Sequence, residues 1–95
     1  MVTADVMDGT SGEIACEVNG ETMQRSDIAD LLFGPAALVS YISSIVTLLP
    51  GDVIATGTPA GVGQARQPPR FLADGDVVTT RIAGVGECSN TCRRT

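Results

Sequence analysis

The chain has 95 residues, of which 43% are hydrophobic and 18% charged, and its formal net charge is −5. This length supports one small domain at most, and the composition is typical of a globular protein rather than a disordered one. Because the charge is negative and no basic run occurs, the sequence argues against nucleic acid as a partner.

Two residue types that often carry catalysis are absent. All six basic residues are arginines, and the chain contains no histidine. An imidazole general base and a Schiff-base lysine therefore cannot come from this chain. The three cysteines, Cys16, Cys88 and Cys92, are expected to be reduced, because their number is odd and no secretion signal is recognisable. The alternatives are a local disulfide between Cys88 and Cys92 or a cysteine metal site.

The longest apolar stretch covers residues 36–49 and contains four Ser or Thr side chains. It is too short and too polar to span a bilayer. The N-terminal residues also lack the basic and apolar regions of a secretory signal. We therefore expect a cytoplasmic protein that has no membrane partner.

The first half of the chain predicts a hairpin, a helical turn and a helix. Residues 13–25 alternate apolar and polar side chains around Asn19-Gly20, a strong hairpin signal. Ser26 is the expected N-cap of a helical turn over residues 27–33. Gly34 ends that turn.

A longer helix is expected over residues 35–49, because Pro35 suits a first helical position and Pro50-Gly51 stops the pattern. Apolar residues recur in it at helical spacing and predict one inward-facing side: Leu38, Tyr41, Ile42 and Ile45.

The second half predicts strands and a loop. Residues 52–56 form a short β-branched segment, and residues 57–70 are rich in glycine and proline. Residues 76–84 alternate as a strand does. A turn bracketed by Gly84 and Gly86 leads to a weaker strand over residues 87–92. The fold class is therefore mixed α+β, rich in β structure, with one main helix in one domain over residues 1–95.

The stretch "TLLPGDVIATGTPAGVG", residues 47–63, resembles a phosphate loop at first sight. The spacing of its glycines fits neither nucleotide fingerprint, and no lysine follows. Two interpretations remain. Gly57 allows close backbone approach and Thr58 supplies a hydroxyl, which suits a substrate-binding turn. Alternatively, the segment is a bend whose threonines bond to their own backbone.

Four blocks in the chain resemble one known family. "VNGETMQ", "LVSYISSIVTLLPGDVIATGTPAGVG", "FLADGDVV" and "IAGVG" are similar, in order and spacing, to the C-terminal portion of the fumarylacetoacetate hydrolase family. The resemblance covers residues 3–90. Beyond it, "ECSNTCRRT" lacks the usual apolar strand ending, and "GQARQPPR" is more basic than the family's loop.

The resemblance implies part of a mixed β-sandwich roll, often dimeric, in an enzyme that needs a divalent metal, usually Mg²⁺ or Mn²⁺. Such enzymes act on 2-oxo acids and 1,3-dicarbonyl compounds as hydrolases, isomerases or decarboxylases. The metal chelates the substrate and stabilises enolate charge. On this resemblance Thr58 would bind the substrate carboxylate or oxo group, and Gly57 would let the backbone approach it.

The family's metal ligands, a Glu-x-Glu pair and an aspartate, precede the matched region, as does its catalytic lysine. We therefore assign no catalytic residue and no metal ligand here, and expect this chain alone to be inactive. Its own carboxylates have simpler interpretations. Glu13 and Glu17 suit a solvated strand face, whereas the other pairs suit a helix start and a turn: Asp27 with Asp30, and Asp74 with Asp76.

Two further interpretations stay open. The chain could be a non-catalytic β-rich domain that associates with another chain, or with its own copies, through exposed faces. It could also be a truncated relic of the family.

Overall fold

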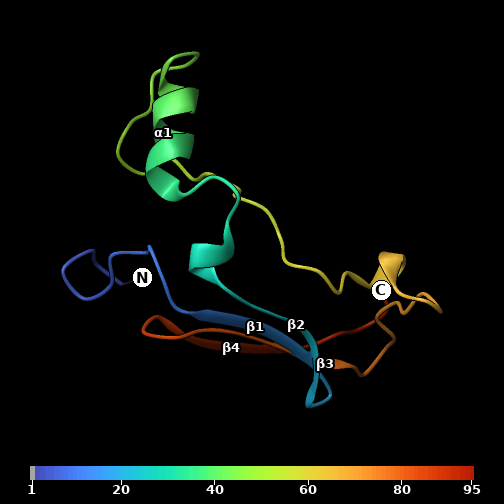
Figure 1. Ribbon diagram of the computed structural model, residues 1–95. Coiled ribbons are helices and arrows are strands. Elements are labelled where there is room, and N and C mark those ends of the chain that lie inside the picture. Colours follow the sequence, from blue (N-terminus) through green and yellow to red (C-terminus); the bar gives the residue numbers. More distant parts are fainter. Residues whose placement is uncertain (1) are drawn as a thin grey trace.

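The computed structural model describes residues 2–95 and centres on one four-stranded antiparallel sheet (Figure 1). The spatial order is β2-β1-β3-β4. The strands are β1 (Glu13–Val18), β2 (Glu21–Asp27), β3 (Val77–Ile82) and β4 (Gly86–Thr91). Each end of the chain contributes one hairpin, and the inner strands β1 and β3 join the two hairpins. The strands expected from the alternation at both ends are confirmed.

The predicted turn at Asn19-Gly20 is present, and both residues have positive φ, 52° and 80°. Asn19 also connects the two hairpins. Its side chain accepts a hydrogen bond from the Val77 amide at 2.9 Å and donates one to the Asp76 carboxylate at 2.8 Å. The first turn therefore fixes where β3 begins.

The predicted helical turn is a short 3-10 helix, η1 (Ile28–Asp30), and its N-cap is Asp27 rather than Ser26. The Asp27 side chain accepts a hydrogen bond from the Ala29 amide, and the Asp30 side chain accepts one from the Asp27 amide. The Ser26 hydroxyl instead donates a hydrogen bond to the Asp30 carboxylate, one residue before the cap. The position of Asp27 and Asp30 at a helix start is confirmed.

The main helix, α1 (Pro35–Ser43), begins at Pro35 as predicted but ends well before residue 49. The hydroxyls of Ser43 and Ser44 donate hydrogen bonds to the carbonyls of Ser40 and Tyr41. Such side-chain hydrogen bonds compete with the backbone hydrogen bonds of the helix and favour its end.

The inward packing predicted for this helix is wrong. Figure 1 shows α1 standing away from the sheet, and it makes no extensive contact with any strand. Tyr41 and Ile45 are 68% and 66% exposed, and only Leu38 and Ile42 are half-buried. Periodicity alone cannot supply the surface against which a helix packs.

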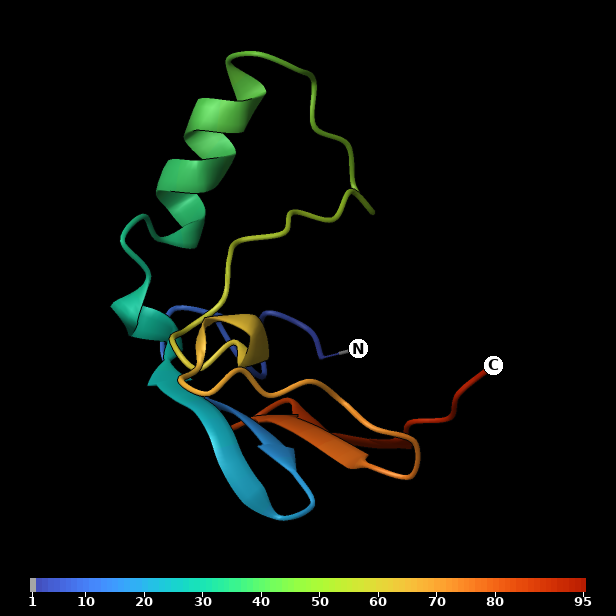
Figure 2. The same cartoon turned by 90° about the vertical axis from the view of Figure 1, so that its right-hand side faces the viewer.

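The strand predicted over residues 52–56 does not form. This segment runs from the end of α1 back to the sheet without pairing (Figure 2). Val53 is 94% exposed. A β-branched segment needs a neighbouring strand for its ladder, and none lies beside it in the part of the chain described.

The two sides of the sheet differ in character, because alternate residues of a strand face opposite ways. We call one side the neutral face and the other the charged face. The neutral face carries Ile14, Cys16, Val18, Gln24, Val78, Thr80, Ile82 and Cys88. The charged face holds ion pairs of Glu13 with Arg25 and of Arg81 with Glu17 and Glu87.

The core is very small. Only Ala15 and Val18 are buried hydrophobic residues among those described, at 5% and 6% exposure. In the register, Ala15 lies between Arg25 and Arg81, and the stems of long arginine side chains can cover such a residue. The sheet is therefore held mainly by its backbone ladders, since exposed ion pairs such as those on the charged face contribute little.

Candidate functional site

Gly57 and Thr58 lie over the neutral face, beside β2. The Gln24 side-chain nitrogen donates hydrogen bonds to the Thr58 hydroxyl at 2.7 Å and to the Pro59 carbonyl at 2.8 Å. Gly57 has φ +132°, and a methyl group added there would meet no atom within 4 Å. The backbone at Gly57 is thus open on the side where a ligand could approach.

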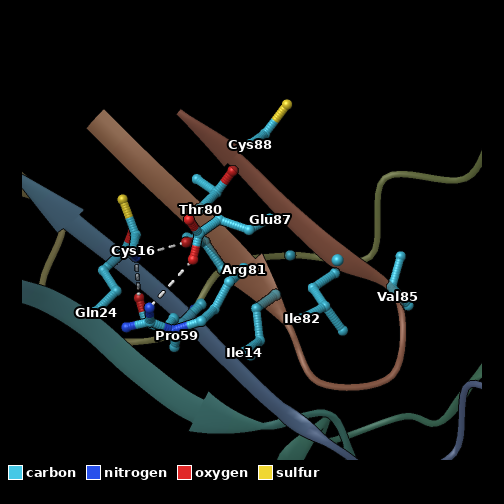
Figure 3. Close-up of a pocket in the computed structure, with 14 residues that line it drawn as sticks. Ile14, Cys16, Gln24, Pro59, Thr80, Arg81, Ile82, Val85, Glu87 and Cys88 are labelled. Carbon is cyan, nitrogen blue, oxygen red and sulfur yellow. Dashed lines mark hydrogen bonds and ion pairs between the residues drawn. The ribbon is translucent and has the colours of Figure 1, made fainter. Parts of the chain in front are cut away.

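A hollow of about 520 Å³ lies between this turn and the sheet (Figure 3). Its floor includes a row of residues paired across all four strands: Gln24, Cys16, Thr80 and Cys88. Ile14, Ile82 and Val85 line one end. The volume is in the range of small-molecule sites, and the wall combines apolar side chains with a few polar groups.

A second hollow of about 250 Å³ lies between the same turn and the beginning of η1. Gly57 and Thr58 line both hollows. The second one is also lined by Asp27 and Asp30. Both carboxylates already accept hydrogen bonds from backbone amides at the start of η1, those of Ala29 and Asp27. The Ser26 hydroxyl, together with the Asp27 amide, lowers the pKa of Asp30 below its usual value.

The loop that follows Thr58 is fastened to an irregularity in β2. The register shifts between Cys16 and Glu17, which leaves Met23 as an extra residue in β2. The Arg66 guanidinium donates to the Met23 carbonyl at 2.7 Å and to the Gly61 carbonyl at 3.1 Å. Arg66 thus supplies the partner that the bulge leaves Met23 without.

Sequence reasoning singled out Gly57 and Thr58, and the structure places both at the edge of a hollow. It missed Gln24 and Arg66. No spacing rule identifies a bulge, so their partners are not readable from the sequence. In the sequence, Gln24 and Arg66 are simply two long polar side chains. Such side chains usually lie in solvent, so nothing marked them as part of a site.

The charged face lies on the opposite side of the sheet from Thr58. Hydrogen bonding and charge from Glu17 raise the pKa of Arg81 above its ordinary value, with a smaller contribution from Glu87. Because Glu13 pairs with Arg25 and Glu17 with Arg81, these two glutamates serve the sheet surface. This agrees with their interpretation as a solvated strand face.

Within residues 2–95, no group of three or more histidine, cysteine, aspartate or glutamate side chains is arranged to hold a metal ion. The residues present therefore do not fit a divalent metal on their own. Cys16, Cys88 and Cys92 are unpaired, as predicted. No helix in the described part of the chain has the length and apolar character needed to cross a membrane.

A sequence profile for "Fumarylacetoacetate (FAA) hydrolase C-terminal" matches residues 1–93. The chain belongs to the fumarylacetoacetate hydrolase family. Among curated relatives, the mitochondrial oxaloacetate tautomerase FAHD2A of Bos taurus is 46% identical over 95% of this chain. That alignment covers 29% of the tautomerase, so the chain spans about three-tenths of the length of such relatives.

Solved structures of family members show the same fold. A putative HpcE protein from Mycobacterium smegmatis has 47% identity and a TM-score of 0.95, covering 99% of this chain and 35% of that one. Maleylpyruvate hydrolase from Sphingobium, solved with manganese(II) and pyruvate, has 35% identity and a TM-score of 0.83. The alignment with it covers 96% of this chain and 32% of the hydrolase.

These similarities confirm the fold expected from the resemblance. The chain corresponds to one part of a fumarylacetoacetate hydrolase fold, the part that carries β1–β4 and α1. Its relatives include hydrolases, isomerases and oxaloacetate tautomerases. The manganese complex supports a divalent metal in members of the family.

Proposed function

We propose that residues 1–95 are a partial catalytic domain that forms the substrate-facing edge of an active site for a 2-oxo acid or 1,3-dicarbonyl compound. The observation that carries the proposal is the turn at Gly57-Thr58. It presents an exposed hydroxyl and an open backbone to hollows on both of its sides. The Thr58 hydroxyl would donate to a carboxylate or oxo oxygen of the substrate.

The family's relatives support this substrate class. The names oxaloacetate tautomerase and maleylpyruvate hydrolase both denote enzymes of 2-oxo acids, and the latter was solved with pyruvate. Hydrolysis, isomerisation and decarboxylation all require such a substrate to be held by its oxygens. The proposal therefore specifies the substrate class and not one of these three reactions.

The remaining machinery would come from outside the described residues. A divalent metal, Mg²⁺ or Mn²⁺, would supply Lewis-acid stabilisation of enolate charge when bound. Since no cluster suited to a metal occurs within residues 2–95, we infer that the ligands lie in another segment or chain. The chain alone is therefore expected to be inactive. The expected cytoplasmic location also stays a prediction, because similar relatives are mitochondrial.

A second candidate function is association through exposed faces, with a copy of the chain or another protein. Among residues 2–95, fourteen large hydrophobic residues are exposed, many of them on α1 and the segment after it, such as Val39, Tyr41 and Ile45. Apolar patches of this kind mark interaction surfaces in soluble proteins. This function is compatible with the first, because a completed active site also requires association.

The substrate proposal is tested by titrating the isotope-labelled chain with pyruvate and following the amide signals of Gly57 and Thr58. We expect both signals to shift. Thr58→Val should weaken binding about tenfold because it removes a hydrogen bond to a charged oxygen, whereas Thr58→Ser should retain it. Thr22→Val is the matched control, since Thr22 is an exposed residue of β2 that pairs with Glu17 on the charged face, opposite the turn.

An absence of pyruvate-dependent shifts in the folded chain would contradict the proposed substrate class. Inactivity alone is tested separately, by assaying the purified chain with oxaloacetate and acylpyruvates in the presence of Mg²⁺. Turnover under those conditions would refute the inference that catalytic groups lie outside these residues.

A further inference from the structure

The side chain of Gln24 fixes the direction of the hydrogen bonds at the candidate site. Its amide nitrogen lies 2.8 Å from the Pro59 carbonyl oxygen and 2.7 Å from the Thr58 hydroxyl oxygen. A carbonyl oxygen can only accept a hydrogen bond, so the atom that faces Pro59 must be the amide nitrogen rather than the amide oxygen. The orientation of Gln24 is therefore determined by its partner.

This orientation constrains the Thr58 hydroxyl. The amide nitrogen of glutamine is a donor with two hydrogens, and here each is directed to one loop oxygen. Thr58 must therefore accept from Gln24 and cannot donate to it. A hydroxyl that has accepted one hydrogen bond keeps its own proton for another partner, and hydrogen bonds in such chains strengthen one another.

We propose that Gln24 is a positioning residue that holds the Thr58 hydroxyl as a donor toward an anionic or oxo oxygen of the ligand. The chemical class selected is an oxygen that only accepts hydrogen bonds, such as a carboxylate. This inference rests on the proposed function for the identity of the ligand, but the Gln24–Thr58 contact can be tested without any ligand.

The fold explains why Gln24 can do this. Gln24 follows the bulge at Met23 and pairs with Cys16, so its side chain lies on the neutral face. Arg66 binds the Met23 carbonyl and the Gly61 carbonyl, which holds the returning loop against the same strand. Figure 3 shows Gln24 and Pro59 close together beside the row that contains Cys16 and Thr80. Two polar side chains from separate elements thus keep the turn in place.

The first test uses the side-chain amide signals of the full chain in a ¹H–¹⁵N spectrum without ligand. The two Gln24 protons should be shifted and protected from exchange, in contrast with those of exposed Gln64. Thr58→Val should move one Gln24 proton signal strongly and the other little, because only one of the two protons faces Thr58. A Gln24 pair that resembles the Gln64 pair would overturn the proposal.

The second test is a double-mutant cycle on pyruvate affinity. Gln24→Leu should weaken binding about tenfold, and the same change in a Thr58→Val background should have little further effect. Gln64→Leu, the same chemical change at an exposed position, should leave affinity unaltered. Independent, additive losses would show that Gln24 supports the loop only, which overturns the positioning role.

The two hypotheses fail in different ways. If the Gln24 signals respond to Thr58→Val but pyruvate causes no shift, the positioning stands and the proposed substrate class is wrong. If pyruvate binds through Thr58 but the cycle is additive, the substrate class stands and the positioning is wrong. Gln24→Glu offers a third check, because its carboxylate would accept the Thr58 proton and should abolish binding of an anion.

Discussion

At Gly61 the chain crosses the bulge of β2 so closely that no side chain fits. A methyl group there would overlap the Met23 carbonyl oxygen, and the residue has φ +109°, a conformation that favours glycine. The close approach is what allows Arg66 to bind the Met23 and Gly61 carbonyls together. Gly61 therefore serves packing, whereas Gly57 has open space around it.

Gly61→Ala should lower the free energy of unfolding by about 2 kcal/mol or more, because backbone strain and overlap add. Gly51→Ala is the matched control: its φ is also positive, +97°, but nothing lies within 4 Å of the added carbon. It should cost about 1 kcal/mol from conformation alone. Denaturant unfolding measures both, and equal losses would show that the overlap is relieved by a small shift.

Asp76 connects three parts of the fold through one carboxylate. It accepts hydrogen bonds from the Ala73 amide at 2.9 Å and from the Asn19 side chain at 2.8 Å. These bonds, first that of Ala73 and then that of Asn19, lower the pKa of Asp76 below 3.8, and Arg70 adds a smaller effect. The interpretation of Asp74 and Asp76 as turn residues agrees with this geometry.

The lowered pKa of Asp76 predicts loss of stability in acid. A carboxyl group with a depressed pKa contributes stability that is present above pH 3.8 and is lost as the pH falls through the lower pKa of the folded state. Asp76→Asn should be less stable at pH 7 and should lose less on acidification. Thermal unfolding between pH 7 and pH 2 measures this. Identical slopes in both proteins would contradict it.

At the scale of elements, the sequence predicted correctly those elements that depend on residues adjacent in the chain. The hairpin at Asn19-Gly20 and the helix start at Pro35 depend on residues adjacent in sequence, and both were predicted. The strand over residues 52–56 and the inward face of α1 were not correct. Each needs a neighbouring surface that the described residues do not supply, and a periodic pattern reports only that such a surface is expected.

At the scale of the whole molecule, the chain is expanded for its length. Its radius of gyration is 15.6 Å, whereas a compact domain of this size has about 12 Å. Its accessible surface is 7342 Å², against about 5200 Å² for a folded monomer of this mass. The difference, about 2100 Å², exceeds the roughly 800 Å² that each partner buries in a standard protein–protein interface. This large exposed surface agrees with the fact that the chain aligns with only 35% of a similar solved structure.

This surface predicts association. The purified chain should elute from size-exclusion chromatography in a concentration-dependent way, larger than a monomer, and should bind an apolar dye. Replacing Tyr41 of α1 and Ile45, just after its end, by serine should reduce both effects. Replacing Thr22 and Gln64, which are exposed but polar, should not. A monodisperse monomer without dye binding would count strongly against association as a function.

The sequence by itself determined the hairpins, the start of the helix and the family, and it singled out Gly57 and Thr58, which we propose contact a substrate. These follow from local turn chemistry, from the alternation of apolar and polar residues and from the sequences of short motifs, which are all properties of neighbouring residues. Only the tertiary structure showed that the Gln24 side chain bonds to the Thr58 hydroxyl and that Arg66 binds the bulge at Met23. Those contacts join residues more than thirty positions apart, and a one-residue bulge, invisible in the pattern, sets which side chains meet.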